Sequence, residues 1–317
     1  MLDFDLTLWI PGSTSLLFVL GLGAYVVVRG FRLRAARQQI QHRILVTGTR
    51  GKSSTVRLIH EALSSLGLRS YGKVTGTTAV ELGVGGRQHD TSRWGTIGVS
   101  EMVDAMHRAR LQKADYGVFE CMAVSLPLIE IVQRDMVRAD IVIIPTIRLD
   151  HLEEEGHSEL EIAMNILKAV RQPKVVINAI SQDDLIAAYQ AHCRKNHIEL
   201  IQVAADSNTP VVPGHHPSNV AITIALCNYL NLDTDTAITS LINSSREPEA
   251  GTIWHYRSGH LTLDYCDLGQ ANDPQSSQEA LQRSGIRQKD RELVPILVNR
   301  WDRPLRALSF VYSLDQG

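Results

Sequence analysis

The sequence has few cysteines and almost no excess of one charge. Its 317 residues include four cysteines, which are scattered without a C-x-x-C pair or disulfide-like spacing. This usage is typical of a reduced cytosolic protein and leaves no cysteine-based metal site. The formal net charge is −2, so no strongly basic surface favours nucleic acid, and we expect no nucleic-acid partner. The chain also lacks internal repeats and low-complexity segments.

One stretch near the N-terminus lacks charge altogether. No Asp, Glu, Lys or Arg occurs between residues 6 and 28, and the stretch is rich in Leu, Val, Phe and Gly. A helix with a rise of about 1.5 Å per residue crosses a bilayer over such a length. Four arginines follow directly, which places the downstream part in the cytoplasm by the positive-inside rule. We therefore predict a single-pass protein of the cell membrane, with a cleaved signal peptide or a buried core helix as alternatives.

The run TGTRGKSS, which begins at Thr47, predicts a phosphate-binding loop between a strand and a helix. Gly48 and Gly51 let backbone N–H groups face inward, and the helix N-terminus adds partial positive charge. Lys52 can reach the β and γ phosphates, and the Ser53 hydroxyl can ligate Mg²⁺. The strict G-x-x-x-x-G-K-[ST] pattern needs a further glycine that is absent here, so the loop is a shorter variant. A strand-to-helix turn that happens to carry a lysine is the alternative.

Runs rich in Val and Ile alternate with helical patterns after the loop. This alternation predicts an α/β fold with a parallel sheet covered by helices on both faces. The predicted strands are 44–47, 116–120, 141–145, 175–178 and 200–204, and the predicted helices are 54–66, 99–111, 160–170, 183–196, 220–230 and 233–242. The predicted domains are an anchor with a basic juxtamembrane segment (1–40), an ATP-binding central domain (41–251) and a short, incomplete α/β C-terminal domain (252–317).

Two polar residues follow successive predicted strands. Glu120 closes the strand 116–120, and His151 follows the strand 141–145. Both would emerge at the carboxyl edge of a parallel sheet, where ligands bind in open α/β folds. Together with Ser53 they can hold a hard divalent cation shared with ATP. Taken singly, Glu120 is equally explained as a surface carboxylate and His151 as a solvated loop histidine.

Four motifs in this order resemble the Mur-ligase-like superfamily: TGTRGKS at 47–53, GKVTGT at 72–77, ECMA at 120–123 and Asp-His at 150–151. Arg50, the ECMA run and the apolar N-terminal segment make the chain most similar to the membrane-anchored synthase of poly-γ-glutamate capsules. The resemblance implies an ATP- and Mg²⁺-dependent amide ligase. Such an enzyme activates a carboxylate as an acyl phosphate and joins it to an amino acid, here glutamate added to a growing polymer. It also implies other membrane subunits of a capsule synthesis complex as partners.

The resemblance further implies roles for individual residues. The implied ATP contacts are Gly48, Thr49, Arg50, Gly51, Lys52, Ser53 and Ser54 in the loop, Asn219 on the adenine side, and Asn272, Asp273, Asp302 and Arg303 in the C-terminal domain. The implied metal ligands are Ser53, Thr75, Glu120 and His151, with Thr77 near the γ-phosphate. The implied catalytic residues are Lys52, Glu120 and His151.

Some family features are displaced or missing in this sequence. Thr252 stands where the family has an arginine, Arg246 is at best a displaced substitute, and Lys168 is out of register with the carbamylated lysine of many Mur ligases. The sequence stops at Gly317, soon after Asp302, so we expect most of the substrate-holding C-terminal domain to be absent. Two other classes therefore stay open: a membrane-anchored P-loop ATPase or kinase, and a nucleotide-binding scaffold subunit of a polymer synthesis or export complex.

Overall fold

The computed structural model of the protein forms two compact units, Met1–Ser244 and Ser245–Gly317. Each unit has its own sheet. The structure describes residues 12–75, 79–91, 98–123, 125–149, 156–170, 172–244, 252–268, 274–286, 294–298 and 304–315.

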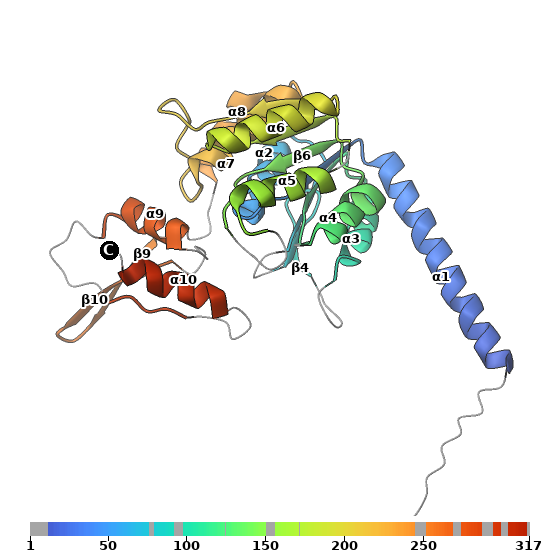
Figure 1. Cartoon of the computed structure of the whole chain (residues 1–317), viewed down its shortest axis with the longest axis horizontal. Helices are drawn as coiled ribbons and strands as arrows, with labels where there is room; N and C mark the ends of the chain where they lie inside the picture. The colour runs from blue at the N-terminus through green and yellow to red at the C-terminus, as the bar shows by residue number, and fades with distance from the viewer. Residues whose placement is uncertain are drawn as a thin grey trace, which may run out of the picture. The chain divides into compact units, whose positions relative to one another are not determined.

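A sheet lies at the centre of the first unit (Figure 1). It has eight strands in the order β4-β3-β2-β5-β1-β6-β7-β8. Its strands are β1 (His42–Val46), β2 (Ser70–Val74), β3 (Val80–Leu82), β4 (Gln88–Asp90), β5 (Tyr116–Glu120), β6 (Ile141–Ile144), β7 (Val175–Asn178) and β8 (Glu199–Gln202). The strands from β2 to β8 in this order pair in parallel, as predicted. At the other edge β3 and β4 pair antiparallel, a feature that the strand patterns did not predict.

Branched apolar residues explain why the central strands form. β6 reads Ile-Val-Ile-Ile and is buried at all four positions, and β7 is likewise buried throughout. A strand that is apolar at every position needs cover on both faces, which a parallel sheet with crossover helices supplies.

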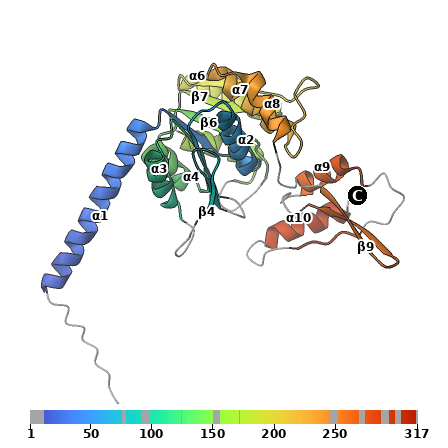
Figure 2. The same cartoon turned by 180° about the vertical axis from the view of Figure 1, so that it is seen from behind.

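Helices cover both faces of the sheet (Figures 1 and 2). One face packs against α1 (Gly12–Gln39), α3 (Glu101–Leu111), α4 (Leu126–Glu130), the π-helix η1 (Ile131–Val137), α5 (Glu159–Ala169) and α6 (Asp183–Lys195). The other face packs against α2 (Lys52–Ser65) and α7 (Pro217–Tyr229). A further helix, α8 (Thr234–Asn243), packs on α2 and α7 through a cluster that includes Leu58 and Leu241.

The helix α1 has two halves with different surroundings. Its first half exposes large apolar side chains such as Phe18, which is 72% exposed, whereas Ala36 near its end is fully buried in the core. The stretch Thr14–Gln39 is long and apolar enough to cross a membrane by length and composition. The part of the predicted span before residue 12 lies outside the described residues.

The second half of α1 is built into the first unit. Arg29 donates from Nη2 to the backbone oxygen of Ser100, just before α3, at 2.9 Å. Near the helix end, Gln39 Nε2 donates to the backbone oxygen of Arg110 at 3.0 Å. The two helices therefore run side by side in the same direction, and two residues separate the end of α1 from β1.

The second unit contains an antiparallel hairpin and two helices among its described residues. These elements are β9 (Thr252–Ser258), β10 (Leu261–Asp267), α9 (Pro274–Ser284) and α10 (Pro304–Asp315). His255 of β9 lies opposite Asp264 of β10, with 2.7 Å between Nδ1 and Oδ1.

Candidate functional site: a phosphate loop and a buried carboxylate

The loop between β1 and α2 is folded against the segment that follows β6. Gly48 has φ +116° and Gly51 has φ +79°, in the region that only glycine adopts without strain. The backbone N–H of Thr49 donates to the oxygen of Thr146 at 3.0 Å. A Cβ on Gly48 would lie 2.9 Å from that same oxygen, so glycine is required for this close approach.

Helix α2 begins directly after the loop, at Lys52. Its N-cap residue Gly51 supplies no side-chain cap, which is the arrangement of helix N-termini that bind anions. The Lys52 ammonium group lies over the loop, where Nζ donates to the oxygens of Gly48 at 2.6 Å and Thr49 at 3.3 Å. The structure thus places a cation beside the uncapped N–H groups of the first turn.

A buried carboxylate joins three elements next to this loop. Glu120, the last residue of β5, is 3% exposed. Ser53 of α2 donates from Oγ to both carboxylate oxygens at 3.0 Å, and the backbone N–H of Thr75, after β2, donates to Oε2 at 2.7 Å. Three of the four predicted metal ligands are therefore brought together at the carboxyl edge of the sheet. Hydroxyl and carboxylate oxygens are ligands of the kind that Mg²⁺ prefers.

Asn219 approaches the loop from α7. It is 5% exposed, and a Cβ placed on Gly51 would lie 3.1 Å from its Oδ1 and 3.2 Å from Pro145 Cβ. The Thr223 hydroxyl donates to its backbone oxygen at 2.9 Å, one helical turn later. The predicted adenine-side asparagine therefore lies against the phosphate loop.

Two supporting contacts and one buried thiol were not predicted from the sequence. The backbone N–H of Arg148 donates to Thr49 Oγ1 at 2.8 Å, and this hydrogen bond holds the loop against the segment that follows β6. Lys73, two residues before Thr75, is fully buried and forms an ion pair with Glu101 of α3 at 3.1 Å. Burial raises the pKa of the Cys121 thiol, next to Glu120, to about 11, so this thiol is protonated at neutral pH.

The described residues thus include the loop from Gly48 to Ser54 together with Thr75, Glu120 and Asn219. Arg50 pairs with Thr146 through its backbone, and Ser54 is half-buried in the first turn of α2. The other predicted site residues lie outside the described residues: Thr77, His151, Asn272, Asp273, Asp302 and Arg303. Within the described part of the chain, no group of three or more His, Cys, Asp or Glu side chains is arranged to hold a metal ion.

Sequence comparison identifies the family of this fold. The Mur ligase middle domain matches residues 46–227, more than half of the chain. The chain belongs to the Mur ligase family. This Mur ligase family member is 22% identical over 293 residues to the capsule biosynthesis protein CapB of Bacillus anthracis, which covers 84% of this chain and 60% of that protein. It is 24% identical over 226 residues to the PGA synthase CapB of Bacillus subtilis, and this match covers 67% of this chain and 55% of that protein. The chain therefore spans less than two thirds of the length of these relatives.

Solved structures share the fold. A point mutant of the folylpolyglutamate synthase (FPGS) of L. casei has a TM-score of 0.57 at 14% identity, over 84% of this chain and 77% of that one. E. coli FolC in complex with ADP has a TM-score of 0.57 at 17% identity, over 81% and 69%. The α/β fold and the superfamily predicted from the motifs are confirmed.

Proposed function

We propose that this chain is an ATP- and Mg²⁺-dependent amide ligase that makes poly-γ-glutamate. A carboxylate oxygen of the growing polymer attacks the γ-phosphorus of ATP, and ADP leaves with formation of an acyl phosphate. The amine of glutamate then attacks the acyl carbon, phosphate leaves and the amine loses a proton. The observation that carries this proposal is the convergence of Ser53, Glu120 and Thr75 beside the Lys52 loop.

The chemistry of these residues fits the phosphoryl-transfer step. Lys52 and the uncapped first turn of α2 lie where they would stabilise charge on transferring phosphate oxygens. Ser53 and Glu120 would hold the metal through oxygen atoms, with His151 as a further proposed ligand. When bound, Mg²⁺ neutralises charge on the nucleotide. Asn219 would contact the nucleotide beside Gly51, and Asn272, Asp273, Asp302 and Arg303 stay further proposed nucleotide contacts.

The relatives support the choice of substrate. Two CapB proteins, one named for capsule biosynthesis and one as a PGA synthase, match 84% and 67% of this chain. The fold is also that of FPGS enzymes, and one FPGS structure holds Mn, AMPPNP and L-glutamate. Glutamate as the incoming amino acid, a polymer as acceptor and further membrane subunits as partners are parts of this proposal.

The same proposal includes membrane attachment. The apolar half of α1 is exposed between Leu16 and Val28, so it is available to lipid. Arginines begin at position 29, which favours a cytoplasmic location for the sheet and its site. The enzyme would then be a single-pass protein of the cell membrane.

Amino-acid-dependent phosphate release tests the reaction. The full chain in neutral detergent is assayed with ATP, Mg²⁺ and single amino acids, and new amide product is followed by mass spectrometry. We expect glutamate to raise phosphate release and to appear in product. Lys52→Ala should lower the rate on the order of 10²- to 10³-fold, the usual loss for one preorganised donor. Lys195→Ala, an exposed lysine at the end of α6, is the matched control and should keep the parent rate.

Two results would contradict the proposal. Phosphate release that is equal with and without every amino acid would favour the P-loop ATPase or kinase. Normal turnover by Lys52→Ala would show that the loop does not act on the phosphates.

A further inference from the structure

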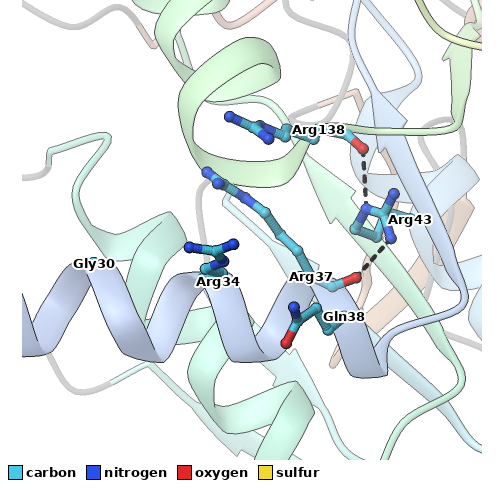
Figure 3. Close-up of a pocket in the computed structure, with 6 residues that line it drawn as sticks. All are labelled: Gly30, Arg34, Arg37, Gln38, Arg43 and Arg138. Carbon is cyan, nitrogen blue, oxygen red and sulfur yellow. Dashed lines mark hydrogen bonds between the residues drawn. The ribbon is translucent and has the colours of Figure 1, made fainter.

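A pocket lined with arginines lies beside the last turns of α1 (Figure 3). Its volume is about 500 Å³, and its lining residues are Gly30, Arg34, Arg37, Gln38, Arg43 and Arg138. Arg43 is the second residue of β1 and Arg138 precedes β6, so the pocket extends from the amino edge of the sheet along α1 toward Gly30 and the apolar half of this helix. It shares no residue with the phosphate loop, which lies at the carboxyl edge.

The pocket is assembled by Arg43. This side chain donates from Nε to the backbone oxygen of Arg138 at 2.9 Å and from Nη1 to that of Arg37 at 2.9 Å, the two dashed contacts of Figure 3. Its charge is balanced by Asp140 at 2.8 Å. Arg43 thus joins the end of α1 to a corner almost a hundred residues later, and the pocket walls are fixed before any ligand arrives.

The other three arginines have no direct carboxylate partner, although the Asp135 carboxylate lies close enough to interact with the charges of Arg37 and Arg138. Arg37 donates from Nε to the backbone oxygen of Met136 at 2.9 Å and from Nη2 to that of Asp135, and neutral carbonyls do not cancel its charge. The carboxylate of Asp135 is itself bound by Arg134 at 2.8 Å. Across the described ranges, no carboxylate forms an ion pair with Arg34, Arg37 or Arg138.

Their guanidinium groups lie on one side of the pocket. Figure 3 shows those of Arg34, Arg37 and Arg138 one above another, from two separate segments. Arg138 has φ +51° at the end of η1, where the chain turns sharply into β6. Guanidinium groups bind phosphate oxygens in paired, directional hydrogen bonds, so three of them without carboxylate partners match a phosphate ester.

The position along α1 indicates where such a phosphate would come from. Gly30 follows the apolar stretch by two residues, and Arg34 lies six residues beyond Val28, roughly 9 Å at 1.5 Å per residue. Headgroups occupy roughly 5–8 Å on each side of the hydrocarbon, and long arginine side chains reach back toward them. We propose that this pocket binds the phosphate of an anionic lipid headgroup. This inference rests on the membrane attachment proposed above, and not on the ligase reaction.

Lipid retention by single variants tests the site. The full chain in neutral detergent is titrated with phosphatidylglycerol or with phosphatidylcholine, and the first bound lipid is quantified by native mass spectrometry. Arg34→Gln and Arg138→Gln should each weaken phosphatidylglycerol binding about fivefold, the usual worth of one arginine near an anionic lipid. Arg32→Gln is the matched control because it removes the same charge from the same helix, about 200° away from Arg34 around its axis. It should leave binding unchanged, as should all three variants for phosphatidylcholine.

Three outcomes separate the possibilities. Selective loss in Arg34→Gln and Arg138→Gln supports the site. Equal loss in all three variants would overturn it, because the effect would then be general juxtamembrane charge. A third arm adds soluble sn-glycerol 1-phosphate, and binding as tight as that of the lipid would overturn the lipid as the source. Glutamate-dependent phosphate release is measured on the same samples, so that a failure of the ligase proposal can be told apart from a failure of the lipid site.

Discussion

The buried ion pair between Lys73 and Glu101 gives the sharpest prediction about stability. The Lys73 side chain is 0% exposed, whereas that of Glu101 is 18% exposed. Glu101→Gln leaves the ammonium group buried without its acid, which costs about 3–5 kcal/mol. For a protein of this size each kcal/mol lowers the melting temperature by about 2–4 °C. We therefore expect a fall of roughly 6–20 °C, measured by circular dichroism at 222 nm on the full chain in detergent.

The same pair also predicts a rescue. The double variant Lys73→Met and Glu101→Gln removes both charges and keeps the volume of the buried side chain at position 73. It should therefore recover most of the melting temperature that Glu101→Gln loses. Asp104→Asn, one turn along α3, is the matched control; its carboxylate lies 3.8 Å from Arg29 and is 55% exposed, so it should cost less than about 1 kcal/mol.

Failure of either part would refute this reasoning. A Glu101→Gln chain that melts with the parent protein would mean that the charge is not effectively buried. A double variant as unstable as Glu101→Gln would mean that the loss of stability comes from α3 itself, and not from the unpaired ammonium group of Lys73. Because Lys73 lies two residues before Thr75, we also expect Glu101→Gln to raise the Mg²⁺ concentration needed for turnover.

Three further predictions concern buried or strained positions of the first unit. Burial lowers the pKa of His60 to about 4, so its neutral form stabilises the fold above pH 6.5 and this stability is lost as the pH falls toward 4. In His60→Gln the melting temperature should therefore fall less steeply over that pH range. Melting temperatures of variant and parent that fall in parallel would contradict this. At pH 8 iodoacetamide should label the half-buried Cys266 before Cys121, and equal labelling by peptide mass spectrometry would exclude a buried, protonated Cys121. Gly51→Ala forces φ +79° on alanine, so it should lower the melting temperature by about 2–8 °C, and an unchanged value would mean that the loop relaxes freely.

The strand, loop and helix from β1 to α2 were predictable because all of their signals are local. An apolar strand, two glycines and a helix beginning with Lys-Ser follow one another in the sequence, and the structure has β1 and α2 at those positions. Glu120 was predicted from its place at the end of a strand, since residues at the carboxyl ends of parallel strands meet at one edge of the sheet. The contact from the Thr75 N–H was not predictable in the same way, because every residue except proline carries that donor.

The strand β2, on which the antiparallel edge is built, was missed for the opposite reason. β2 reads Ser-Tyr-Gly-Lys-Val, and a glycine and a lysine in five residues argue against a buried strand. The structure tolerates both residues through distant partners. Lys73 is neutralised by Glu101, and a Cβ on Gly72 would lie 3.1 Å from Leu82 of the neighbouring strand. The arginine pocket depends on partners even further apart in sequence, since nothing near Arg138 connects it with Arg37.

The short joint between α1 and β1 fixes the direction of the sheet relative to α1. Because β1 runs back from the end of α1, and α3 begins beside Arg29, the carboxyl edge of the sheet faces the side from which α1 enters. If α1 spans the bilayer and the loop after β1 binds ATP as proposed, no flexible tether lies between lipid and the reacting phosphates, and the height of the reaction above the surface is set by the protein. Under the proposed function, each new polymer end would then stay within a thin layer at the membrane surface, where it would meet other membrane components by diffusion in two dimensions and not in three.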